Sequence, residues 1–132
     1  MNKIEQGTHQ GTSWSKEGSG PPLILVHGLG LNRQMWQWQM GCLTPHFSVI
    51  YYDLLGHGES VNPKIPCQLE QFSEQLLLLM KGQKLEKCTL VGFSLGGLIA
   101  QDFALRHNEK VSALVILNTS HGRSEKERKA VL

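Results

Sequence analysis

The chain has 132 residues, of which 40% are hydrophobic and 18% charged, and its formal net charge is +2 at pH 7. This length and composition are typical of one globular domain that can bury a core. The small net charge gives no support for nucleic acid or an acidic membrane as a partner. We expect no secretory signal in "MNKIEQGTHQGTSW" and no transmembrane segment, because the longest apolar runs, "LLLLM" and "ALVIL", are too short to span a bilayer.

Cysteine usage indicates the redox compartment. The three cysteines, Cys42, Cys67 and Cys88, are an odd number and show no C-x-x-C spacing. This pattern argues against a disulfide framework or a zinc site and is typical of proteins in a reducing cytosol. We therefore expect a cytoplasmic protein without a metal ion or an organic cofactor.

Glycine and proline divide the chain into short apolar segments. Residues 1–21 are turn-rich and are expected to hold a short hairpin at most. Residues 23–30, "LILVHGLG", predict a strand buried on both faces. The next segment predicts a short helix capped by Asn32, with Met35, Trp36 and Trp38 burying one of its faces.

The remaining segments alternate between strand and helix patterns. The predicted elements are a strand within 47–60, a helix at 69–82, a strand at 87–93, a helix at 95–107 and a strand at 110–118. This order predicts one α/β domain over residues 1–132, with a mostly parallel sheet and helices on both faces. Ser124 and Glu127 form a capping-box pattern, so residues 120–132 are expected to open a further helix, similar to the start of a cap.

One serine lies where an apolar strand gives way to a helix, in the segment "CTLVGFSLGGLIAQ" at residues 88–101. Ligands of open α/β sheets bind beyond the carboxyl ends of the strands, and Ser94 lies at such an end. A side chain exposed on so sharp a turn needs small neighbours. Gly92 and Gly96 supply them in the pattern G-x-S-x-G, and Gly97 adds a further small residue.

The helix that follows Ser94 supports a catalytic interpretation. Its N-terminal N–H groups favour developing negative charge, so the Leu95 N–H is a candidate half of an oxyanion hole. The structural alternative is that Gly92 and Gly96 only permit close packing of strand and helix. A phosphate-binding loop is not supported, because neither "GFSLGG" nor "GLGLNR" matches G-x-G-x-x-G and no Walker lysine follows.

Three landmarks together resemble the α/β-hydrolase superfamily. They are "LVHGLG" at 25–30, "DLLGHGES" at 53–60 and "GFSLGG" at 92–97, and their order is similar to the N-terminal half of esterases, lactonases and C–C hydrolases. The resemblance implies that Ser94 is the nucleophile and that the N–H groups of Leu29 and Leu95 form the oxyanion hole.

The resemblance also assigns supporting residues. His27 and Gly28 match the family's HG oxyanion loop, where the histidine usually braces the loop. The segment 53–60 matches D-x-R-G-x-G-x-S, a loop that is usually structural, but Leu55 replaces the common arginine, so we expect any ion pair of that arginine to be missing. A serine rather than an aspartate at position 94 indicates acyl chemistry on an ester, thioester, lactone or activated ketone.

The family's catalytic acid and histidine follow the nucleophile on later strands. No residue of this chain matches either, so we expect both to be absent and the chain to be truncated before the cap and the last strands. His27, His57 and His121 all follow predicted strands, but a base needs hydrogen-bond contact with the serine and an orienting acid, so none of them is favoured.

The expected function is therefore that of a serine hydrolase acting through an acyl-enzyme on Ser94, with a small-molecule acyl substrate, and inactive alone. Two alternatives remain open: a non-catalytic binding module with the hydrolase fold, and one half of a split enzyme. The apolar strand at 111–117 is expected to form an unprotected sheet edge, which invites self-association or pairing with a complementing C-terminal chain.

Overall fold

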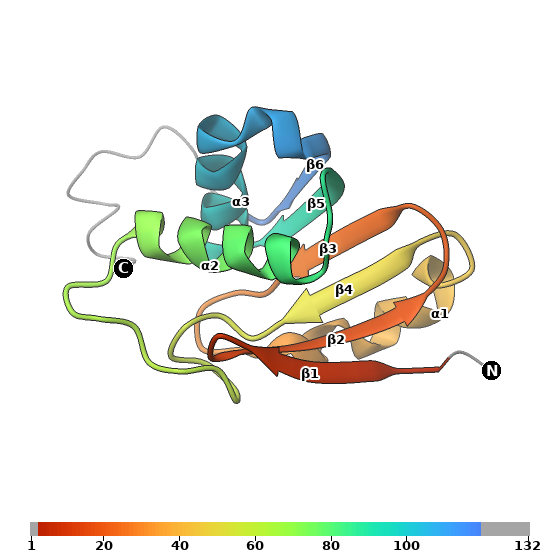
Figure 1. The fold of residues 1–132 in the computed structure, drawn as a ribbon, viewed down its shortest axis with the longest axis horizontal. Coiled ribbons are helices and arrows are strands. Elements are labelled where there is room, and N and C mark those ends of the chain that lie inside the picture. The colour runs from red at the N-terminus through yellow and green to blue at the C-terminus, as the bar shows by residue number, and fades with distance from the viewer. Residues whose placement is uncertain (1–2, 120–132) are drawn as a thin grey trace.

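Six strands form one sheet in the computed structural model, which describes residues 3–119 (Figure 1). The strands are β1 (Glu5–His9), β2 (Thr12–Gly18), β3 (Pro22–Val26), β4 (Ser48–Tyr52), β5 (Cys88–Phe93) and β6 (Val111–Leu117), and their order in the sheet is β1-β2-β4-β3-β5-β6. The pairs β3–β4, β3–β5 and β5–β6 are parallel, whereas β1–β2 and β2–β4 are antiparallel. The predicted α/β fold with a mostly parallel sheet is confirmed.

Helical segments cover both faces of this sheet. They are the 3₁₀ helix η1 (Arg33–Gln39), α1 (Met40–Leu43), α2 (Leu69–Gly82), α3 (Leu95–Arg106) and the short 3₁₀ helix η2 (Asn108–Lys110). Helices α2 and α3 lie side by side on one face, and η1 with α1 lies on the other (Figure 1). No helix within residues 3–119 has both the length and the apolarity needed to cross a membrane.

The apolar runs of the central strands form two hydrophobic clusters because successive side chains of a strand point to opposite faces. Ile24 and Val26 of β3 pack toward α2 and α3, while Leu23 and Leu25 pack toward η1 and α1. All four side chains are buried. Burial of each is worth about 1.5–3 kcal/mol, so the strand is fixed from both sides and its carboxyl end is held in place.

The N-terminal hairpin is larger and more integrated than the sequence indicated. Strand β2 pairs over five residues with β1 and over five with β4, so the hairpin completes the sheet. Its pattern is polar because Ser13 and Ser15 are buried as hydrogen-bond acceptors for Arg33, and Thr12 accepts a hydrogen bond from Gln75. Periodicity of apolar residues therefore gave no signal for this strand.

The segment after β3 was predicted correctly at its cap and only partly in its packing. The Asn32 side chain accepts a hydrogen bond from the Gln34 N–H at 2.9 Å, which confirms the N-cap. Trp36 is buried and Met35 is half-buried, but Trp38 is 82% exposed, so its expected burial is wrong. With about three residues per turn in a 3₁₀ helix, Trp36 shares its face with buried Arg33 and Trp38 does not.

Candidate functional site

Ser94 lies at the carboxyl end of β5, on the turn into α3. Its backbone has φ +57° and ψ −117°, a conformation that residues with a Cβ atom rarely adopt. Its side chain is half-buried. The turn therefore stores backbone strain at the residue that the G-x-S-x-G pattern singled out, as in a nucleophile elbow.

The glycines around Ser94 allow three chain segments to approach each other closely. A Cβ on Gly92 would collide with the carbonyl group of Gly96, and a Cβ on Gly96 would collide with the carbonyl oxygen of Val26 in β3. A Cβ on Gly97 would collide with the side chain of Thr119. The elbow is thus pressed against both β3 and the segment after β6.

The neighbouring strand β6 also holds the turn. The Ser94 N–H donates to the Leu117 carbonyl at 3.0 Å. The Ser94 carbonyl accepts from the Gly97 N–H at 2.9 Å and from the Thr119 hydroxyl at 2.7 Å. Sequence reasoning missed Thr119; the available signal was a hydroxyl residue directly after the strand predicted to neighbour Ser94.

The backbone N–H groups of Leu29 and Leu95 lie beside Ser94 and are the sequence-predicted oxyanion donors. Neither the Leu29 N–H nor the Leu95 N–H forms a hydrogen bond to another residue within 3–119. The loop that carries Leu29 lies against the elbow, because a Cβ added to Gly28 would be 3.2 Å from the Ser94 Cβ. Leu95 is the first residue of α3, where the helix dipole adds to the attraction for an anion.

A small, mostly apolar cavity of about 200 Å³ opens beside these two residues. Its lining consists of Leu29, Leu55, Gly56, His57, Pro63, Cys67, Phe72 and Leu95. The lining reaches the residues next to the elbow but does not include Ser94 itself. An apolar acyl or alkyl group could occupy this space.

His27 is fully buried and braces the loop that carries Leu29. Its Nε2 accepts from the Leu54 N–H at 3.0 Å, so its Nδ1 carries the proton and donates to the Gly28 carbonyl at 2.8 Å. Burial lowers the pKa of His27 below its ordinary value, which keeps the ring neutral. Both ring nitrogens are engaged, so the side chain serves the loop and is not available to Ser94.

The loop between β4 and α2 is organised by a buried ion pair that the sequence did not reveal. Arg33 Nη1 lies 2.5 Å from Asp53 Oδ2, and the Arg33 N–H donates to Asp53 Oδ1 at 2.8 Å. The same carboxylate accepts the Glu59 N–H at 3.0 Å. Leu55 stands where an arginine was expected, and the cation instead comes from η1, on the preceding crossover.

No histidine or carboxylate within residues 3–119 accepts a hydrogen bond from the Ser94 hydroxyl, so none of them activates it. Both nitrogens of His57 are occupied by backbone groups, and Asp102 accepts from Ser73 and Arg106. His121 and the predicted helix at 120–132 lie outside the described residues. Within the described part of the chain, no cluster of His, Cys, Asp and Glu side chains could hold a metal ion.

The fold and the motifs define the class of protein. Residues 21–131 match the alpha/beta hydrolase fold family, which is most of the chain, and the chain therefore belongs to this family. The resemblance inferred from the three motifs is confirmed.

Particular relatives are esterases and other hydrolases. The chain is 40% identical over 107 residues to the pimeloyl-[acyl-carrier protein] methyl ester esterase of Vibrio vulnificus (strain YJ016). The aligned residues cover 81% of this chain and 40% of that protein. Its structure resembles a hydrolase from Pseudomonas aeruginosa PA01 with a TM-score of 0.82 and 32% identity, over 96% of this chain and 51% of that one. It also resembles the enol-lactonase from Burkholderia xenovorans LB400, with a TM-score of 0.79 and 32% identity, over 88% of this chain and 47% of that one. The chain spans about half of the solved structures and 40% of the curated relative.

Proposed function

We propose that Ser94 is the nucleophile of a serine hydrolase that cleaves an ester, thioester or lactone through an acyl-enzyme. The observation that carries this proposal is the strained turn at Ser94, beside the Leu29 and Leu95 N–H groups, which form no hydrogen bond within residues 3–119. A protein that only binds a ligand has no need to hold a serine in this conformation. The relatives named as a methyl ester esterase and an enol-lactonase support acyl chemistry.

The chemistry follows from the position of these groups. Ser94 Oγ attacks the carbonyl carbon, its proton passes to a base, and the carbonyl electron pair becomes an oxyanion that the Leu29 and Leu95 N–H groups stabilise. Collapse of this intermediate expels the alkoxide or thiolate, which takes the proton from the base. A water molecule then repeats the attack on the acyl-enzyme and releases the acid and the serine.

The base and its orienting acid are proposed to come from outside residues 3–119. The serine hydroxyl is a weak nucleophile without them, so this part of the chain is expected to be inactive alone. A complementing C-terminal chain, as in a split enzyme, would supply both. The free thiols of Cys42, Cys67 and Cys88 support a cytoplasmic location, where such a chain could be synthesised beside this one.

The alternative function is a non-catalytic module that binds a small apolar molecule. The cavity beside Leu29 and Leu95 favours it, because its lining is mostly apolar and its volume of about 200 Å³ suits a short acyl or alkyl group. This module would use the hydrolase fold without its chemistry, and Ser94 would then have no reactivity.

A fluorophosphonate probe separates these functions. We expect the chain alone to remain unlabelled, and labelling of Ser94 to appear when the C-terminal half of a homologous esterase is co-expressed. Mass spectrometry of the digested protein locates the label, and Ser94→Ala should abolish it. A complemented preparation that binds a small apolar ester yet never acquires the label at Ser94 would favour the binding module.

The outer edge of β6 is the proposed contact with that second chain. The strand ends the sheet among the described residues, and Leu114, Val115, Ile116 and Leu117 are between 37% and 43% exposed. A continuous apolar edge without proline or charge pairs readily with another strand, from a complementing chain or from a second copy of this one.

Val115→Lys should therefore reduce self-association of the isolated chain. A charge on an edge strand opposes pairing, whereas the fold retains its other strand contacts. Size-exclusion chromatography should show oligomers for the wild type and a monomer for the variant. A wild-type chain that elutes as a stable monomer contradicts this proposal.

A further inference from the structure

A second histidine contacts the candidate oxyanion loop from outside the HG motif. The Gly30 N–H donates to His57 Nε2 at 3.0 Å, and His57 Nδ1 lies 3.0 Å from the Leu55 carbonyl. Because Nε2 accepts a hydrogen bond, the ring proton lies on Nδ1 and is donated to Leu55. The imidazole therefore links the loop after β3 to the loop after β4.

The position of this link matters because Gly30 directly follows Leu29. On the other side of Leu29, the Gly28 carbonyl accepts from His27 Nδ1 at 2.8 Å and from the Leu31 N–H at 3.2 Å. Leu29 itself is 57% exposed, so its own side chain does little to anchor the peptide that carries its N–H. The orientation of the Leu29 N–H therefore depends on the groups that hold Gly28 and Gly30.

The loop that carries His57 is a rigid support. The His57 N–H donates to the Leu54 carbonyl at 2.9 Å, and the Ser60 N–H donates to the His57 carbonyl at 3.1 Å. The Ser60 hydroxyl donates to the Asp53 carbonyl at 2.6 Å, beside the buried ion pair with Arg33. The His57 ring is thus fixed at its base and offers Nε2 in one direction.

His27 and His57 hold the loop after β3 on opposite sides of Leu29. His27 is fully buried and holds Gly28 from inside the fold, whereas His57 lines the cavity with Leu29 and holds Gly30 from the open side. Their ring centroids lie 5.2 Å apart. The loop is therefore clamped on both sides of the candidate oxyanion donor.

We infer that His57 is a positioning residue for the oxyanion hole. By accepting a hydrogen bond from the Gly30 N–H, it holds the backbone on the C-terminal side of Leu29, so that the Leu29 N–H faces the acyl oxygen. The inference rests on the proposed function for its catalytic meaning. His57 transfers no proton and does not touch Ser94, so its effect on the reaction passes through Leu29.

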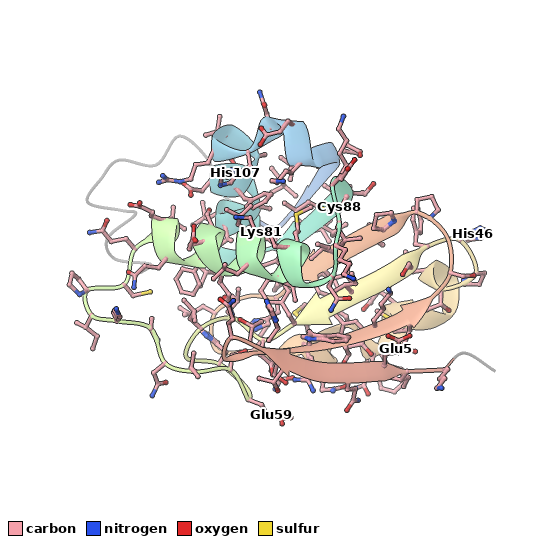
Figure 2. All side chains as sticks on the ribbon, in the orientation of Figure 1. Glu5, His46, Glu59, Lys81, Cys88 and His107 are labelled. Carbon is pink, nitrogen blue, oxygen red and sulfur yellow. The ribbon has the colours of Figure 1, made fainter. Side chains whose placement is uncertain are left out.

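The first test measures how firmly His57 holds the Gly30 N–H, and it does not require enzymatic activity. His57→Phe keeps a ring but removes the acceptor, and His57→Gln retains an oxygen acceptor near the position of Nε2. In the ¹⁵N-labelled full chain, hydrogen exchange at the Gly30 amide should rise about tenfold in His57→Phe and stay near the wild-type rate in His57→Gln. His46→Phe, on an exposed residue before β4 at the other end of the sheet (Figure 2), is the matched control and should leave Gly30 unchanged.

The second test measures the rate at which Ser94 is labelled by the fluorophosphonate probe in the complemented protein. His57→Phe should lower the maximal rate of Ser94 labelling by about tenfold while the half-saturating probe concentration is unchanged, since only the developing oxyanion loses support. His57→Gln should restore most of the rate. Equal Gly30 exchange in wild type and His57→Phe overturns the inference whether or not Ser94 reacts. If His57→Phe alters Gly30 exchange but Ser94 of the complemented wild type does not react, His57 does hold the loop and only the proposed function is rejected.

Discussion

Gly96→Ala is expected to destabilise the protein by about 2 kcal/mol or more, although the residue lies in a helix. Alanine normally stabilises a helical position relative to glycine by about 1 kcal/mol, because it restricts the unfolded chain. Here the added Cβ would lie 2.5 Å from the His27 carbonyl oxygen and closer still to that of Val26. Backbone atoms of a central strand cannot move aside as a flexible side chain can, so the clash outweighs the helical preference. Urea unfolding followed by tryptophan fluorescence gives the difference in free energy.

Gly41→Ala is the matched control for this prediction. Gly41 is also helical, in α1, but a Cβ built there meets no atom within 4 Å. The substitution should be neutral or stabilise the protein by about 0.5–1 kcal/mol. If both alanine variants changed the free energy of unfolding alike, the close approach of the elbow to β3 would be wrong.

The same close approach explains why the candidate site could be located from sequence. A buried parallel strand, a tight turn and a helix leave a residue pattern, because only small residues fit around Ser94. The HG and D-x-x-G-x-G-x-S segments likewise carry glycine where the loops cross at short range. The parts of the site whose geometry depends on neighbours along the chain could therefore be predicted from local sequence.

Long-range polar contacts left no comparable pattern. Arg33 looks like an ordinary surface residue of a short helix, yet it is buried against Asp53 and two serines of β2. Thr119 holds the Ser94 carbonyl from the segment after β6. Such partners are set by the order of strands in the sheet, which brings together residues far apart in sequence. The sequence indicated a short hairpin at most, and the extent of the polar strand β2 was underestimated for the same reason, because its buried hydroxyls are satisfied by distant side chains.

Arg33→Met is expected to destabilise the protein by about 3–5 kcal/mol, because it leaves the Asp53 carboxylate buried without its cation. Asp53 is 1% exposed, and Arg33 Nη1 lies 2.5 Å from its Oδ2. The variant also removes the donors that satisfy the Ser13 and Ser15 hydroxyls. The loop at 53–60, which carries His57, should loosen together with the hairpin. Urea unfolding measures the loss, and hydrogen exchange of the loop amides locates it.

The double variant Arg33→Met/Asp53→Asn tests whether an unpaired charge causes this loss. Removing both charges should cost less than the sum of the single substitutions by about 1–3 kcal/mol, since neither charge then remains buried alone. Arg106→Met is the matched control, because its pair with Asp102 at 2.7 Å lies on the exposed side of α3. Its effect should be a small fraction of that at Arg33, because water screens an exposed pair. Strict additivity of the two single variants would instead mean that Arg33 and Asp53 stabilise the fold independently of each other. In that case Asp53 would hold the loop through the backbone hydrogen bonds that its carboxylate accepts, and its pairing with Arg33 would contribute nothing.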